Sequence, residues 1–189
     1  MSGGTFFEKT GFPVGSFAGR RALNTQNYTE ANIKLGVQHE GSTLLTVAGL
    51  GVNDTIFLTG SLPVSLKHRQ IGFTGTGVSA FIYKAPTYAG GTSVAYQNPN
   101  SINPVTGLSQ IIVGSTVSDD GVLTFAPDHL IGSTSKQGKG SSPSTIGQEK
   151  ILAPNTAYLL RLTSLDAQEQ QITSHLSWYE GTFDLPVGA

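Results

Sequence analysis

Short runs of strand-forming residues, each closed by glycine, proline or asparagine, recur along this chain from about residue 41 onwards. Examples are residues 44–48 (LLTVA), 55–59 (TIFLT) and 78–83 (VSAFIY). Branched and aromatic side chains suit a pleated surface, and the closing residues suit turns. About eight such runs, with no convincing helix between them, predict an all-β chain folded as an antiparallel β-sandwich or a barrel.

The clearest alternation lies in the C-terminal third. Residues 157–163 place Tyr158, Leu160 and Leu162 on one face, and residues 172–179 do the same with Ile172, Leu176 and Trp178. Two amphipathic strands this close in sequence predict an antiparallel hairpin. The pattern also predicts that Trp178 lies in the core and that Tyr179 points outwards as an exposed contact.

Two long polar loops, at about 87–108 and 127–149, interrupt the strands. Eight antiparallel strands with two such loops favour a jelly roll over residues 41–189. Asp119-Asp120-Gly121 is typical of a tight hairpin turn leading into the next strand, at residues 122–125. This explains the paired carboxylates better than a glycosidase site does.

Residues 1–40 lack any period of 2 or 3.6 and predict an extended N-terminal arm. A disordered tail is the alternative, but such tails are usually poor in aromatic residues. We therefore expect the arm to dock on a neighbouring subunit. The candidate contacts are its aromatic and paired basic residues: Phe6, Phe7, Phe12, Phe17, Arg20 and Arg21.

The surface must be covered mainly by uncharged polar residues, because charged residues make up only 12% of the chain, against about 25% in an average domain. Such a surface costs little to desolvate when another protein covers it. The net charge of −1 argues against nucleic-acid binding. No apolar run approaches the length of a membrane span, and no secretory signal is visible, so we expect the protein to act where it is made.

Nothing in the sequence indicates catalysis. The absence of cysteine excludes disulfides and thiolate metal sites. No serine lies in a Gly-x-Ser-x-Gly elbow, and Asp128-His129 beside so many serines carries no signal. No two histidines have metal-ligand spacing: His39, His68, His129 and His175. We therefore expect no enzyme activity, no cofactor and no metal.

One small basic cluster, Lys67-His68-Arg69, falls at a pause between two strand-like segments. Its simplest interpretation is a solvated strand end. The alternative is a contact with an acidic patch on a partner.

Two segments carry a family resemblance: residues 152–163 (LAPNTAYLLRLT) and residues 176–180 (LSWYE). They resemble head decoration, or capsid cement, proteins of tailed bacteriophages. Residues 63–67 (PVSLK) through 81–83 (FIY) are similar too, so that the resemblance covers roughly residues 41–181.

The resemblance implies a jelly-roll body that binds the outer surface of the capsid and clamps neighbouring major capsid proteins. It implies a virion location, synthesis in the host cytoplasm, and self-association as a dimer or trimer. It offers no catalytic residues. A rigid body and an arm that bind together would strengthen each other's contacts.

Two other functions remain open. The first is a tail-fibre or receptor-binding domain that recognises carbohydrate through exposed aromatic and amide side chains. Its possible members are Tyr83, Tyr88, Tyr96, Asn98 and Asn100. The second is a polysaccharide-degrading jelly-roll enzyme, for which no constellation of carboxylates or histidines stands out.

Overall fold

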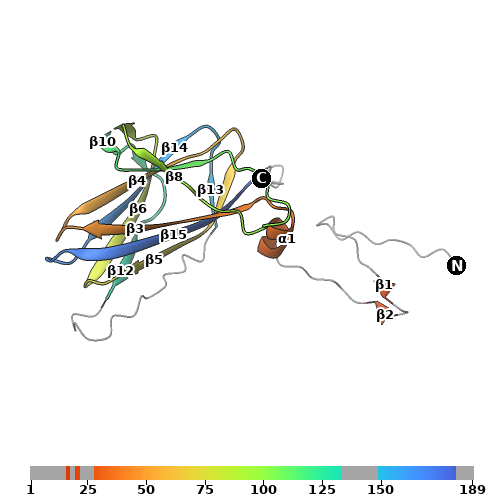
Figure 1. Ribbon diagram of the computed structural model, residues 1–189. Helices are drawn as coiled ribbons and strands as arrows, with labels where there is room; N and C mark the ends of the chain where they lie inside the picture. Colours follow the sequence, from red (N-terminus) through yellow and green to blue (C-terminus); the bar gives the residue numbers. More distant parts are fainter. Residues whose placement is uncertain (1–15, 18–19, 22–27, 133–148, 182–189) are drawn as a thin grey trace.

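The computed structural model describes residues 16–17, 20–21, 28–132 and 149–181. Within these residues the chain forms one short helix and a series of antiparallel strands (Figure 1). The elements are β1 (Ser16–Phe17), β2 (Arg20–Arg21), α1 (Tyr28–Lys34), β3 (Gln38–Val47), β4 (Val52–Leu58), β5 (Val64–Phe73), β6 (Gly77–Lys84), β7 (Thr87–Ala89), β8 (Thr92–Val94), β9 (Gln110–Val113), β10 (Thr116–Asp119), β11 (Val122–Leu123), β12 (Asp128–Ile131), β13 (Lys150–Leu152), β14 (Ala157–Ser164) and β15 (Gln170–Glu180).

Two antiparallel sheets form the body, which confirms the predicted all-β sandwich. The smaller sheet has the order β13-β5-β15-β3. The larger has the order β11-β6-β14-β4-β9-β8. β12 pairs with the same edge of β6 as β11 does, further along the strand. Inward-facing side chains of the two sheets pack against each other, as expected for aligned sheets.

The strands β3 to β6 alternate between the two sheets, and β14 and β15 again lie in opposite sheets. β3, β5 and β15 belong to the smaller sheet, whereas β4, β6 and β14 belong to the larger. The prediction that β14 and β15 form a hairpin is therefore wrong: β14 pairs with β4 and β6, and β15 with β3 and β5. Both strands bury one face in the same core, and an arch between sheets satisfies that pattern as well as a hairpin does.

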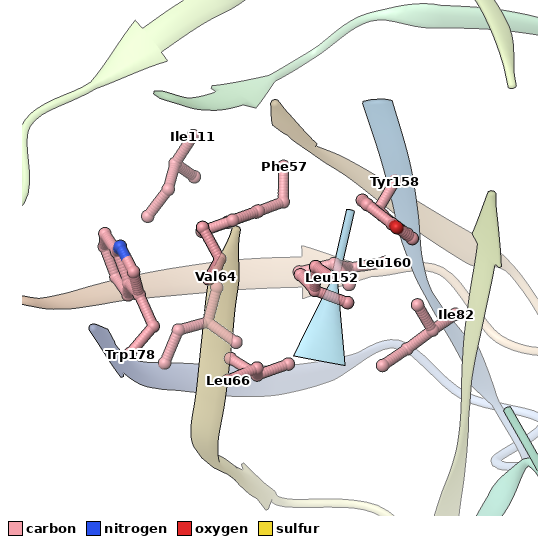
Figure 2. Packing of buried hydrophobic residues seen from close by; sticks show 10 residues of the cluster. Phe57, Val64, Leu66, Ile82, Ile111, Leu152, Tyr158, Leu160 and Trp178 are labelled. Carbon is pink, nitrogen blue, oxygen red and sulfur yellow. The ribbon is translucent and has the colours of Figure 1, made fainter. Parts of the chain in front are cut away.

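The core consists of two neighbouring clusters of buried side chains. The larger one surrounds Trp178, whose indole packs edge-on against Phe57 at 5.2 Å between ring centroids (Figure 2). The second contains Val47, Ile71, Phe73, Val78, Ala80, Leu162 and Ile172. The predicted core face of the C-terminal strands is confirmed, since Tyr158, Leu160, Leu162, Ile172, Leu176 and Trp178 are all buried.

The first strand of the body is longer than the sequence pattern predicts. β3 begins at Gln38 rather than Leu44, and α1, which was not predicted, precedes it. Ala31, Asn32, Gln38 and His39 are buried. Part of the segment that was assigned to the arm therefore packs against the sandwich.

The chain between β6 and β12 leaves the sandwich and returns to it. β8 and β9 extend the larger sheet beyond β4, while β7 and β10 form a separate two-stranded ribbon. Residues 119–121 do form a turn, in which Gly121 has φ 79° and donates its N–H to Asp119. The predicted hairpin is wrong, however, because β10 pairs with β7 and β11 with β6.

Candidate interaction surface

Exposed apolar side chains gather at the end of the sandwich where β3 begins and β15 ends. Ile102 is 85% exposed, and Leu35 follows α1 directly. Figure 1 shows the segment between β8 and β9, drawn in green, passing beside α1. We call the exposed apolar residues directly after α1 and in this segment the end surface: Leu35, Ile102, Val105 and Leu108.

Hydrogen bonds hold the end surface in place. The N–H of Val105 donates to the carbonyl of Gly36 at 3.0 Å. The amide of Asn98 donates to the carbonyls of Gly36 and Val105, and the amide of Asn100 to that of Lys34. Gly36 has φ 72°, and a Cβ there would lie 2.1 Å from the carbonyl oxygen of Asn103. The close approach of the two segments therefore requires glycine.

A buried carboxylate anchors the other end of the segment. Glu180 accepts the N–H of Leu108 at 2.7 Å and the N–H of Ser109 at 3.0 Å. It also accepts the indole N–H of Trp178 at 3.3 Å. A carboxylate that accepts several N–H groups offsets its own burial, so Glu180 acts here as a structural acceptor.

Two titratable rings lie beside Glu180. The ring of His39 packs against Tyr96 at 5.5 Å and against Trp178 at 5.8 Å between centroids. Burial lowers the pKa of His39, and the charge of Glu180 only partly opposes this. Burial, aided by Glu180, raises the pKa of Tyr96, whose hydroxyl donates to the carbonyl of Ser109. Both rings are therefore uncharged near neutral pH.

A second charged group lies on the outer face of the larger sheet. Arg161 on β14 forms two parallel hydrogen bonds with Asp54 on β4, at 2.7 and 2.8 Å. Its third bond, at 2.5 Å, reaches Asp120 in the turn after β10. The two hydrogen bonds with Asp54, helped by the one with Asp120, raise the pKa of Arg161. The turn is thus tied to the sheet, and Asp120 has a structural partner.

The basic cluster at residues 67–69 is not a solvated strand end. β5 runs through it, and a register shift opposite Ser177 and Trp178 turns Arg69 into the sandwich, where it is 2% exposed. One guanidinium nitrogen donates to the carbonyl of Phe81 at 3.2 Å. The Nε and Nη2 atoms have no partner in the described part of the chain. Burial lowers the pKa of Arg69 to about 10, although the negative charge of Asp128 acts to raise it.

Three of the predicted arm contacts, Phe6, Phe7 and Phe12, lie outside the described residues. β1 and β2 pair so that Phe17 is opposite Arg20 and Ser16 opposite Arg21. Figure 1 draws this pair apart from the sandwich.

The residues considered for carbohydrate recognition are not gathered at one place. Asn98 and Asn100 bind backbone carbonyls within the chain, as described above. Tyr83 lies under Arg161, with the guanidinium 5.9 Å from the ring centroid. Tyr88 belongs to the β7–β10 ribbon. The amides of Asn98 and Asn100 and the hydroxyl of Tyr96 are used in folding, and this does not favour a sugar site.

The prediction that Tyr179 is an exposed contact is wrong, since it is 5% exposed and lies beneath the ammonium of Lys67 at 4.8 Å. Among the residues that the structure describes, no group of three or more histidine, aspartate or glutamate side chains is placed to hold a metal ion. No helix in the same residues is long and apolar enough to cross a membrane.

Comparisons with known proteins give no relative. No family model matches the chain, and neither a curated protein nor a solved structure matches it significantly.

Proposed function

We propose that this chain is a capsid decoration protein of a tailed bacteriophage, which binds the outer surface of the shell and clamps neighbouring major capsid proteins. The observation that carries the proposal is the end surface, a set of exposed apolar side chains on a rigid support beside α1. Residues 1–27, with the candidate arm contacts Phe17, Arg20 and Arg21, enter the body through this helix. Body and arm would therefore bind side by side.

The physical argument is the cost of covering the surface. Burying one leucine, isoleucine or valine side chain stabilises a complex by roughly 1.5–3 kcal/mol. Because only 12% of residues are charged, few ions must be desolvated around these anchors. The charged groups of Arg161 and Glu180 already have partners within the chain. These features suit a permanent contact better than they suit catalysis.

The strand order supports a jelly-roll body as part of the same proposal. Following the chain, β3, β5, β13 and β15 make up the smaller sheet, and β4, β6, β12 and β14 belong to the larger, which β8, β9 and β11 extend. Eight strands divided in this way between two antiparallel sheets are typical of jelly rolls. The strands β7 to β11 then form an insertion between β6 and β12, the fourth and fifth of these eight strands.

The first experiment measures copy number. Quantitative mass spectrometry of purified particles that carry this chain should give an amount of the same order as the major capsid protein. Only a few copies per particle would contradict a shell protein and indicate the tail. Complete absence from particles would contradict any structural role in the virion.

The second experiment tests the end surface. Shells that lack the chain are mixed with the full protein, with Ile102→Asp/Val105→Asp, and with a truncation lacking residues 1–27. We expect the wild type to co-sediment with the shells and both changed proteins to bind less tightly. The matched control is Val122→Asp, an exposed apolar residue on β11. Equal binding by all four proteins would refute the role of the end surface and the arm.

The truncation begins at α1 for a structural reason. The arm predicted from the sequence runs to residue 40, but Ala31 and Asn32 within it are buried. Removing them would expose the start of β3 and confuse a binding defect with a folding defect. A circular dichroism spectrum and a melting curve of the 28–189 protein check that the body is intact.

A further inference from the structure

The outer edge of β3 offers a row of backbone groups to another chain. β3 is the last strand of the smaller sheet, and its inner neighbour is β15. At its beginning the outer side is occupied, because Glu40 exchanges two hydrogen bonds with Gln97, at 2.8 and 2.9 Å. In a strand, backbone groups alternate between the two sides, so Ser42, Leu44 and Thr46 point their N–H and C=O groups the same way as Glu40.

These groups have no partner in the described part of the chain. All three residues are exposed, and Leu44 is 67% exposed. Charged residues and proline commonly protect an edge, and residues 41–47 (GSTLLTV) contain neither. An edge of this kind is a template for pairing with a strand of another molecule.

We infer that the outer edge of β3 binds the same edge of a second copy of this chain, antiparallel, about a twofold axis at Leu44. In this register Leu44 lies opposite Leu44 of the other copy, and Ser42 lies opposite Thr46. Each of these pairs would exchange both N–H···O bonds. The smaller sheets of the two copies would then form one continuous sheet.

The structure fits a second copy as occupant because the free edge is bounded symmetrically about Leu44. On one side of Leu44, Gln97 already covers Glu40. On the other side, β3 ends at Val47, and the chain turns away through Ala48 to Gly51. In the twofold arrangement the turn after β3 of one copy would lie beside Gln97 of the other copy. The pairing would therefore stop at the same point at both of its ends. The side chains also match, apolar on apolar and hydroxyl on hydroxyl.

This inference goes beyond the proposed function and is tested without shells. The chain contains no cysteine, so single cysteines report contacts cleanly. Residues in a hydrogen-bonded antiparallel pair have Cα atoms about 5.5 Å apart, within the range that a disulfide spans. Under mild oxidation the full-length Leu44→Cys protein should form a covalent dimer. The exposed control Gln70→Cys, on β5, should stay monomeric.

The register has its own test. Ser42→Cys alone should crosslink poorly, whereas a mixture of Ser42→Cys and Thr46→Cys should give a mixed dimer. Efficient crosslinking of Ser42→Cys alone and none of the mixture would overturn the twofold axis at Leu44. If Leu44→Cys gives no more covalent dimer than Gln70→Cys, the self-pairing is overturned. The same result is expected if the edge pairs with a different protein instead.

Charge reversal separates specific pairing from random collision. By sedimentation velocity, Leu44→Lys and Leu44→Glu should each self-associate about tenfold or more weakly than the wild type, because like charges then face each other across the axis. Mixing the two variants should restore the dimer. Failure of the mixture to associate while the wild type dimerises would place the contact elsewhere.

Discussion

Arg161 and Asp54 face each other across β14 and β4, joined by two parallel hydrogen bonds of 2.7 and 2.8 Å. Both side chains are less than one-fifth exposed. The same guanidinium reaches Asp120, so it connects the sheet to the turn that follows β10. Bidentate pairing of this kind is beyond lysine, which carries a single ammonium.

Replacing Arg161 by lysine should therefore destabilise the protein, by about 1–2 kcal/mol, because at least one bond to Asp54 or Asp120 is lost. Arg161→Ala should cost more, since it leaves two carboxylates close together. Urea unfolding at neutral pH measures the difference. The control is Lys34→Ala, whose pair with Glu30 is more than half exposed and should contribute no more than about 0.5 kcal/mol. Equal losses in Arg161→Lys and Lys34→Ala would contradict a stabilising role for the bidentate pair of Arg161 and Asp54.

Arg69 should behave in the opposite way. It is fully inside the sandwich, and only one of its nitrogens has a partner in the described residues. Replacing a poorly satisfied buried charge by an apolar side chain of similar volume is often neutral or stabilising. We expect Arg69→Met to keep or raise the free energy of unfolding. A loss of more than about 2 kcal/mol would mean that Arg69 holds a group that stabilises the fold.

Gln170 connects the two arches at the end of the sandwich where β5 leads into β6. Its side-chain carbonyl accepts the N–H of Gly75 at 2.9 Å. Its side-chain amide donates to the backbone carbonyl of Gly77 and to the hydroxyl of Ser164. Gln170→Leu should cost about 2–3 kcal/mol, because these buried groups lose their partner. The neighbouring Gln171→Leu, at an exposed position, is the matched control and should change stability little. Thermal unfolding of the two variants compares them directly.

The sequence pattern predicts which face of a strand is buried better than it predicts which strands are paired in a sheet. Alternation correctly places Trp178 in the core. It gives the correct direction for Tyr179 too, but it carries no information about Lys67, whose side chain covers that ring from the adjacent strand. Likewise it cannot distinguish a hairpin from an arch between β14 and β15, because both bury the same residues. Pairing partners are properties of the tertiary structure.

The candidate site shows the same limit. Leu35, Ile102, Val105 and Leu108 lie in segments without regular alternation, so sequence alone gives no reason to group them. The signal that was available is the run of asparagine, proline and glycine around them, which is typical of an ordered loop held by its own side chains. The inward turn of Arg69 depends on a register shift, which a pause at residues 68–70 hints at but does not define.

Acid should loosen the end surface through His39. Burial lowers the pKa of this imidazole below its ordinary value of 6.5. Well above pH 6.5 the ring is neutral in both the folded and the unfolded chain, and its contribution to stability is fully present. As the pH falls below 6.5, the unfolded chain takes up the proton first, so stability decreases until the folded pKa is reached.

Urea unfolding between pH 7.5 and 5 should therefore show a decrease that is smaller in His39→Gln than in the wild type. Glu180 and Tyr96 face the ring and are unchanged in this comparison. His175→Gln, on the outer face of β15, is the control and should keep the wild-type dependence on pH. Hydrogen exchange at the N–H groups of Leu108 and Ser109, which bind Glu180 beside the ring, should speed up on acidification in the wild type. An identical pH dependence in His39→Gln and the wild type would show that protonation of His39 does not control this end of the sandwich.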